Sequence, residues 1–188
     1  MLFCGINPGL YTAAVGHHFA RPGNRFWKVL HEAGFTDRLL SPFEEAGLLD
    51  AGIGITNLVA RATATAAELT RGELGEGARL LEAKVAATHP QIVAMLGMQA
   101  FRTAFGDRTA ALGLQPQPMA HSRVWLLPNP SGLQARYQLP DLIAFFEDLR
   151  AAASRTDGAP SRRRRAEPRG RGLRSARAVR AIRPATER

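Results

Sequence analysis

The chain has 188 residues, of which 45% are apolar and 22% are charged, and its formal net charge is +9. This length suits one domain with a well-buried core and is too short for two such domains joined by a long linker. The composition is typical of a soluble globular protein, and the positive charge is compatible with a polyanionic partner.

The excess charge lies entirely in the last part of the chain. Residues 1–153 contain 13 Lys and Arg against 13 Asp and Glu, whereas residues 154–188 contain 12 Arg against three acids, a net charge of +9. The second segment includes Arg162-Arg163-Arg164-Arg165 and has too few large apolar side chains to offset the entropy of ordering. We therefore expect a domain at 1–153 and a disordered tail at 154–188 that attracts phosphates without sequence preference.

The single cysteine, Cys4, excludes an intrachain disulfide and a cysteine cluster for zinc or iron–sulfur ligation. No run of 18 apolar residues is present, and the chain does not start with a basic stretch followed by an apolar segment. We expect a cytoplasmic protein with no membrane span, no metal and no cofactor.

Short apolar runs alternate with longer periodic stretches in chain order. Buried strands are predicted at 2–6, 52–56, 91–96 and 124–127. Helices are predicted after a capping Asn24, and at 72–88, 98–105 and 139–152. This alternation predicts a three-layer α/β/α domain with a short, mostly parallel sheet of four to five strands.

Two loops follow the first and the last predicted strands, and both contain Asn-Pro and Gly. They are Asn7-Pro8-Gly9-Leu10 and Pro128-Asn129-Pro130-Ser131-Gly132-Leu133. Either loop alone is an ordinary turn. Because ligands of such folds bind at the carboxyl ends of the strands, two such loops at equivalent strand ends predict a binding site.

Five motifs in register resemble the mismatch-specific uracil/thymine DNA glycosylase family, within the uracil-DNA glycosylase superfamily. They are Gly5-Ile6-Asn7-Pro8-Gly9-Leu10, Gly16-His17-His18-Phe19, Asn24-Arg25-Phe26-Trp27-Lys28, Gly54-Ile55-Thr56-Asn57-Leu58-Val59 and Asn129-Pro130-Ser131-Gly132-Leu133. The resemblance covers nearly all of residues 1–150 and leaves out the tail.

The resemblance implies a monofunctional hydrolase that acts on double-stranded DNA. Such an enzyme flips a mismatched or damaged pyrimidine, uracil above all, out of the duplex and hydrolyses its bond to deoxyribose. The abasic product would pass to downstream repair enzymes. We expect the protein to act as a monomer.

The same resemblance assigns roles around the base. Asn7 would hold the attacking water through its amide oxygen, and Phe19 would stack on the base. Backbone groups around Ile6 and Phe19 would read the polar edge of the base, with Gly9, Thr12 and Asn129 also in the base site. The alternatives are that Asn7 only forms a turn and that Phe19 is a core aromatic.

Contacts to DNA are expected from the second loop and from two histidines. Leu133, preceded by Ser131 and Gly132, would enter the gap left by the flipped nucleotide, unless it packs under its own loop. Arg136 would contact guanine or phosphate. His17 and His18 would contact DNA or form an exposed pair, and Asp50 would act as an auxiliary acid or base or else cap a turn.

The motifs combine features of two branches. His17-His18 and Thr56-Asn57 resemble the thymine-processing vertebrate branch, whereas Asn129-Pro130-Ser131-Gly132-Leu133 resembles the bacterial uracil branch. One alternative function is a uracil glycosylase that acts on single strands and A·U pairs. Another is a non-catalytic nucleic-acid-binding module. Activity on U·G duplex compared with single-stranded uracil separates these alternatives.

Overall fold

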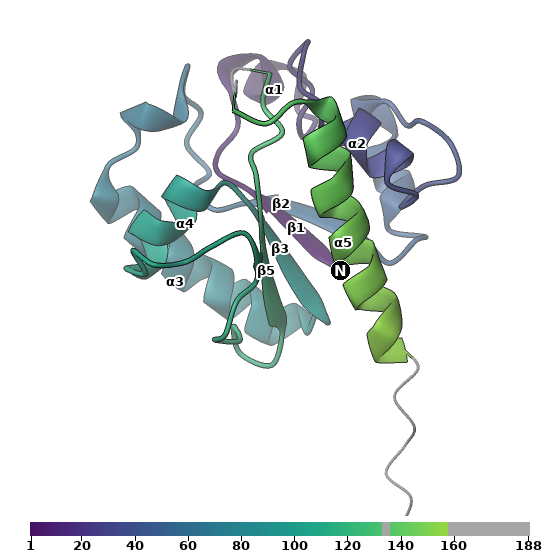
Figure 1. Ribbon diagram of the computed structural model, residues 1–188. Coiled ribbons are helices and arrows are strands. Elements are labelled where there is room, and N and C mark those ends of the chain that lie inside the picture. Colours follow the sequence, from purple (N-terminus) through teal and green to yellow (C-terminus); the bar gives the residue numbers. More distant parts are fainter. Residues whose placement is uncertain (133–135, 158–188) are drawn as a thin grey trace, which may run out of the picture. The chain divides into compact units, whose positions relative to one another are not determined.

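The computed structural model describes residues 1–132 and 136–157, which are built around a five-stranded sheet (Figure 1). The strand order is β2-β1-β3-β5-β4. Every neighbouring pair is parallel except β4 and β5, which are antiparallel. The strands are β1 (Leu2–Gly5), β2 (Gly54–Asn57), β3 (Ile92–Leu96), β4 (Gly113–Leu114) and β5 (Arg123–Leu127).

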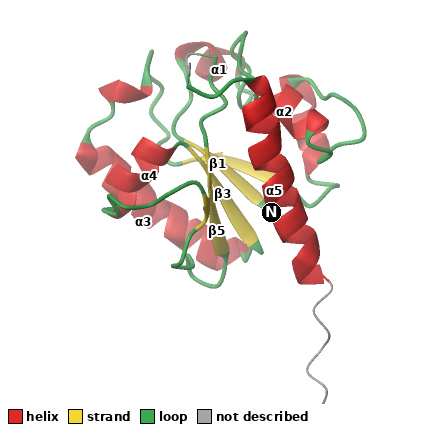
Figure 2. Cartoon of the chain, viewed as in Figure 1, coloured by secondary structure: helices red, strands yellow, loops and turns green. Residues whose placement is uncertain are grey.

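Helices cover both faces of this sheet (Figure 2). One face carries α2 (Phe26–Glu32) and α5 (Leu139–Asp157), and the other carries α3 (Arg71–Thr88) and α4 (Met98–Phe105). The predicted three-layer α/β/α fold with a mostly parallel sheet is confirmed. None of the helices in the described part of the chain is both long and apolar enough to cross a bilayer.

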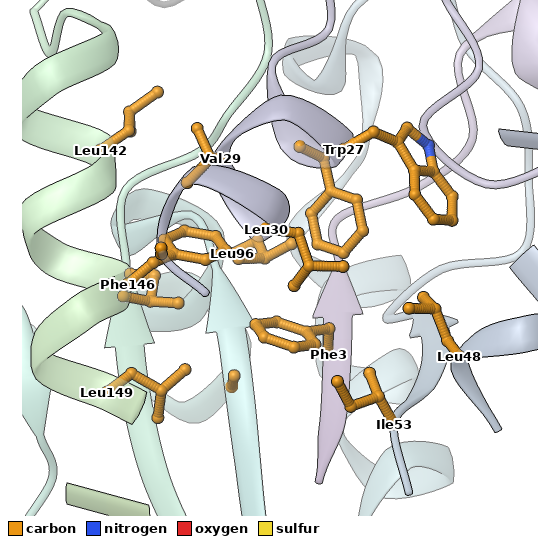
Figure 3. Packing of buried hydrophobic residues seen from close by; sticks show 14 of the residues in the cluster. Phe3, Trp27, Val29, Leu30, Leu48, Ile53, Leu96, Leu142, Phe146 and Leu149 are labelled. Atoms are coloured by element: carbon orange, nitrogen blue, oxygen red, sulfur yellow. The ribbon is translucent and has the colours of Figure 1, made fainter. Parts of the chain in front are cut away.

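The core between the sheet and the helices α2 and α5 combines aliphatic side chains with a group of aromatic rings in contact (Figure 3). The ring of Phe3 in β1 meets Phe26 edge-on at 5.5 Å and lies parallel to Phe146 of α5 at 5.7 Å. All three residues are fully buried. Because fully buried aromatic side chains make large apolar contributions to stability, these rings fix both helices on the strand that leads into the first loop.

The opposite core is formed mainly by aliphatic side chains and small residues. Helix α3 begins with a capping box in which the Thr70 hydroxyl accepts from the Glu73 amide at 3.1 Å. Leu74, Leu81 and Val85 face the sheet. Gly77 lets α3 approach the chain beyond β2, since a β-carbon there would lie closer than 3.0 Å to the Leu58 carbonyl oxygen.

The structure also contains short elements that the sequence pattern did not predict. They are α1 (Leu10–Val15), the 3-10 helices η1 (Pro42–Leu48) and η2 (Ala66–Glu68), and β4. The predicted end of the domain after Ala153 falls inside α5, which continues through Asp157. Within this last part of the helix, the Ser154 hydroxyl donates to the Arg150 carbonyl at 3.1 Å.

Two glycines of α3 provide a matched test of this packing. Gly77→Ala should lower the free energy of unfolding by about 1–3 kcal/mol, because the new methyl group overlaps the Leu58 carbonyl. Gly75→Ala should raise the same free energy by about 0.5–1 kcal/mol, since nothing lies within 4 Å of the position that its β-carbon would take. Urea denaturation of both variants measures the two effects, and equal changes would contradict the assigned contact.

Candidate active site

A pocket of about 430 Å³ lies at the carboxyl end of β1. Helix α1 follows directly from this end of the strand (Figure 1). The pocket is lined by the residues of five segments, which are Gly5, Ile6, Asn7, Pro8, Gly9, Thr12, Phe19, Arg21, Asn24, Asn57, Thr63, Ala64, Thr65, Ala66, Asn129 and Ser131. Seven residues proposed from the sequence for the water, the base or the DNA are in this set, namely Ile6, Asn7, Gly9, Thr12, Phe19, Asn129 and Ser131.

The side-chain amide of Asn7 is held in one orientation. Its Nδ2 atom donates to the Thr63 hydroxyl at 2.7 Å, to the Arg61 carbonyl at 2.9 Å and to the Pro8 carbonyl at 3.3 Å. Carbonyl oxygens can only accept, so the nitrogen must face them. The amide oxygen is thereby left available on the other side, and no hydrogen bond to it is found within the described residues.

Thr63 completes this arrangement. It is 3% exposed, and its hydroxyl donates to the Thr65 carbonyl at 2.8 Å. Because that proton is committed to Thr65, the hydroxyl oxygen acts as an acceptor toward Asn7. The resulting chain of hydrogen bonds increases the negative partial charge on the Asn7 amide oxygen.

The segment that contains Thr63 is attached to the start of α3. The Arg61 guanidinium donates to both carboxylate oxygens of Glu73, at 2.5 and 3.1 Å, and to the Glu68 carbonyl. The hydrogen bond from Arg61, followed by those from Thr70, lowers the pKa of Glu73 to about 2. Glu73 is therefore ionised at neutral pH, and the Arg61 carbonyl that holds Asn7 belongs to a chain segment with a fixed position.

Phe19 forms a flat apolar wall of the pocket. Its ring stacks on Phe26 with centroids 4.1 Å apart, and its backbone has a φ of 55°. A bulky residue in this left-handed region carries strain of about 1–3 kcal/mol, which surrounding contacts must maintain. Such a wall suits stacking against a planar heterocycle.

His17 and His18 do not line the pocket. The Nδ1 atom of His17 lies 3.3 Å from one oxygen of Glu45, and the backbone amide and Nδ1 of His18 lie 2.9 and 3.0 Å from the other. Burial acts to raise the pKa of Glu45, but the hydrogen bonds from His18 and His17 outweigh it and lower that pKa. The pair thus connects the turn before Phe19 to η1, and the His18 carbonyl also accepts from Trp27 Nε1 at 3.1 Å.

Asp50 is also away from the pocket. It is exposed and precedes β2, so it lies toward the amino ends of the parallel strands, where the Met1 amino group donates to the Gly52 carbonyl. The pocket lies at the opposite, carboxyl ends. Asp50, predicted as an auxiliary acid or base or as a turn cap, is therefore not among the residues that line this pocket. Among the pocket-lining residues that the structure describes there is no carboxylate.

The second loop contributes Asn129 and Ser131 to the pocket. The Asn129 side-chain oxygen accepts from the Ser131 amide at 3.0 Å, which fixes the turn. Arg136 places its guanidinium 5.4 Å from the centroid of the Tyr137 ring and borders an adjoining hollow of about 230 Å³. Leu133, the predicted wedge, lies outside the described residues.

Five polar residues of the pocket had no assigned role at the binding site from the sequence alone. They are Arg21, Asn24, Asn57, Thr63 and Thr65. The predicted cap at Asn24 is one residue too early, because Arg25 occupies the N-cap position of α2. The Asn24 side-chain oxygen accepts from the Phe26 amide at 2.9 Å and so stabilises the turn that leads into the helix. Asn57 stands in the motif 54–59, which resembles the family but gave this residue no role at the site. Thr63 stands in none of the five motifs. Within the described residues, no cluster of three or more His, Cys, Asp or Glu could hold a metal ion.

A comparison with protein families agrees with this geometry. The family model of the Uracil DNA glycosylase superfamily matches residues 1–150. The chain belongs to the Uracil DNA glycosylase superfamily. Membership in the uracil DNA glycosylase superfamily makes the protein a DNA glycosylase of the hydrolase class, and the pocket at the carboxyl end of β1 is its candidate active site.

The hydrogen bond between Asn7 and Thr63 can be tested with two substitutions. Thr63→Val keeps the shape of the side chain but removes the oxygen that accepts from Asn7. This variant should lower the single-turnover rate on uracil-containing duplex by about tenfold, because the loss of one hydrogen bond costs about 1 kcal/mol. Thr63→Ser retains the hydroxyl and should remain within about threefold of the unmodified protein. Equal rates for the two variants would show that the hydroxyl does not orient Asn7.

Proposed function

We propose that this glycosylase is a monofunctional, mismatch-specific enzyme that removes uracil from G·U pairs by means of a water held by Asn7. The observation that carries the proposal is the locked Asn7 amide, whose nitrogen is bound by three oxygen atoms and whose oxygen is left available in the pocket. An amide oxygen accepts a hydrogen bond from water and orients it without removing a proton.

The reaction follows from the charges that form as the glycosidic bond breaks. Positive charge grows on the sugar and negative charge on the departing pyrimidine, so the site must place a water near the sugar and stabilise the base anion. No carboxylate of the described residues lines the pocket, so general-base catalysis, commonly worth about a hundredfold or more, is forgone. We therefore expect slow hydrolysis that relies on positioning the water.

Phe19 supports the proposed base site. Its exposed ring face offers a surface on which a flipped pyrimidine would stack, while Phe26 holds the ring from behind. The backbone around Ile6 and Phe19 would read the polar edge of the base. Gly9 and Thr12 lie at the beginning of α1 and would form the wall beside the base.

Preference for a mismatch would come from the cost of flipping. Extruding a nucleotide costs a few kcal/mol, and this cost is smallest for a mismatched pair. We propose that Leu133 occupies the vacated position in the stack and that Arg136 contacts guanine or phosphate. The partner would be double-stranded DNA, the product an abasic site for downstream repair enzymes, and the protein a cytoplasmic monomer.

The role of Asn7 predicts a severe loss on its removal. Asn7→Ala should lower the single-turnover rate on a U·G duplex by about a hundredfold or more, because the attacking water loses its positioning group. The measurement is alkali cleavage of the strand after incubation with excess protein. Leu133→Ala should mainly weaken duplex binding.

Controls separate this proposal from its alternatives. Gly75→Ala lies on α3 outside the pocket and should cleave at the unmodified rate. Faster cleavage of single-stranded or A·U uracil than of U·G would favour another branch, and an intact U·G strand with the unmodified protein would refute the proposal.

A further inference from the structure

The second loop belongs to the connection 128–138 between β5 and α5, and one side chain, Arg25, binds this connection on both sides of Leu133. Its two terminal guanidinium nitrogens donate to the Ser131 and Tyr137 carbonyls, each at 2.8 Å, and its Nε atom approaches the Pro130 carbonyl at 3.4 Å. Its backbone amide also donates to the Pro130 carbonyl at 3.0 Å. Arg25 therefore determines how far apart the two ends of the loop lie.

These contacts depend on the shape of a guanidinium group. Its donors are arranged in a rigid planar fork, so two carbonyls on different chain segments can be bound at the same time. Hydrogen bonds from a charged donor are stronger than neutral ones. The half-buried Arg25 is thus committed to backbone carbonyls of the protein itself.

The backbone beside Arg25 supports the same loop. A β-carbon at Gly132 would lie closer than 3.0 Å to the Gly23 carbonyl oxygen, so the two backbones are in direct contact. Gly23 has a φ of 82°, which favours glycine. Its neighbours Arg21 and Asn24 line the pocket. One turn, 21–25, therefore forms part of the pocket rim and also supports the second loop.

The far end of the loop is anchored to α5. The Tyr137 ring meets Phe145 edge-on at 5.5 Å, and the Arg136 guanidinium lies 5.4 Å from the centre of the same ring. The hydrogen bond from Arg25 to the Tyr137 carbonyl thus connects the pocket rim to a helix of the core.

We propose that Arg25 is a positioning residue for duplex engagement, which sets the separation and direction of the two ends of the loop in which Leu133 stands. This inference rests on the proposed function. Arg25 acts through the loop, so it matters for opening a base pair and not for the hydrolytic step at Asn7.

Two duplexes that differ only in the cost of opening the pair test this role. One contains U·G, and the other contains uracil opposite an abasic-site analogue, where no partner base must be separated. The readout is the ratio of the single-turnover rates on U·G and on the unpaired uracil. A loss of folded protein lowers both rates equally and leaves this ratio unchanged.

Arg25→Met should lower the ratio by about tenfold, because it removes the charged hydrogen bonds to Ser131 and Tyr137. Arg25→Lys keeps the charge but not the fork, and should lower the ratio nearly as much. Arg102→Met is the matched control, since Arg102 likewise donates to a backbone carbonyl, that of Ala110, outside the pocket. Its ratio should stay within about twofold of the unmodified protein.

Several outcomes would overturn the proposal. An unchanged ratio in Arg25→Met would show that the loop is positioned without Arg25, and full rescue by Arg25→Lys would indicate a direct contact between its charge and phosphate. If the unmodified protein cleaved neither duplex, the proposed function itself would fail. Hydrogen exchange gives a readout that is independent of cleavage. Arg25→Met should speed exchange of the backbone amides of Ser131 and Tyr137 and leave exchange in α3 unchanged. Unchanged exchange at Ser131 and Tyr137 would refute the positioning role of Arg25.

Discussion

The pocket depends on the absence of a side chain at Gly5, the last residue of β1. A β-carbon there would lie 2.5 Å from the Asn57 side-chain oxygen and 3.1 Å from the Phe19 ring. Asn57 comes from the neighbouring strand β2, and Phe19 comes from a turn with a strained backbone. Because both side chains occupy the space beside Gly5, the positions of Asn57 and Phe19 in the pocket depend on each other. The strain at Phe19 is maintained by stacking on Phe26 and by the contacts between Glu45 and the two histidines.

The polar groups of the pocket favour orientation over proton transfer. The Asn7 nitrogen is bound to two carbonyls and to Thr63, and the Thr63 proton is bound to Thr65. This network leaves the amide oxygen of Asn7 as the atom that can contact a ligand. Neither an amide nor a hydroxyl is a strong base, so these groups orient a ligand and do not remove a proton from it. The charged Arg61 and Glu73 pair stays outside the pocket and holds the segment that presents Thr63. This ion pair therefore stabilises the segment behind Asn7, whereas the side chains that hydrogen-bond to Asn7 and Thr63 are neutral.

Much of the fold and part of the site could be predicted from the sequence. Buried apolar runs gave the four longer strands, because strands covered on both faces are continuously hydrophobic. Asn7 and Asn129 were found because they stand in short motifs at strand ends, and Phe19 was found because it stands in a motif that resembles the family. The chain direction of β2 could have placed Asp50 away from the pocket. This residue precedes the strand, whereas the pocket lies at the carboxyl ends of the strands.

The contacts of Thr63 and Arg25 could not be predicted in the same way. Arg25 binds backbone carbonyls more than 100 residues away in the chain, and a carbonyl gives no signal in the sequence. Thr63 meets Asn7 only because the chain after β2 passes over the end of β1. The short helices α1 and η1 were missed because each buries a single residue, Thr12 or Leu48, and so neither shows an apolar period.

The contact between Gly77 and the Leu58 carbonyl limits how the domain can change. Leu58 directly follows Asn57, so the helix on the far face of the sheet meets the backbone next to a pocket residue. A larger residue at 77 would overlap this backbone, which continues directly into Asn57. Tolerance to substitution on α3 should therefore be uneven. Position 75 has open space for a side chain, whereas position 77 is constrained by backbone next to a residue of the pocket.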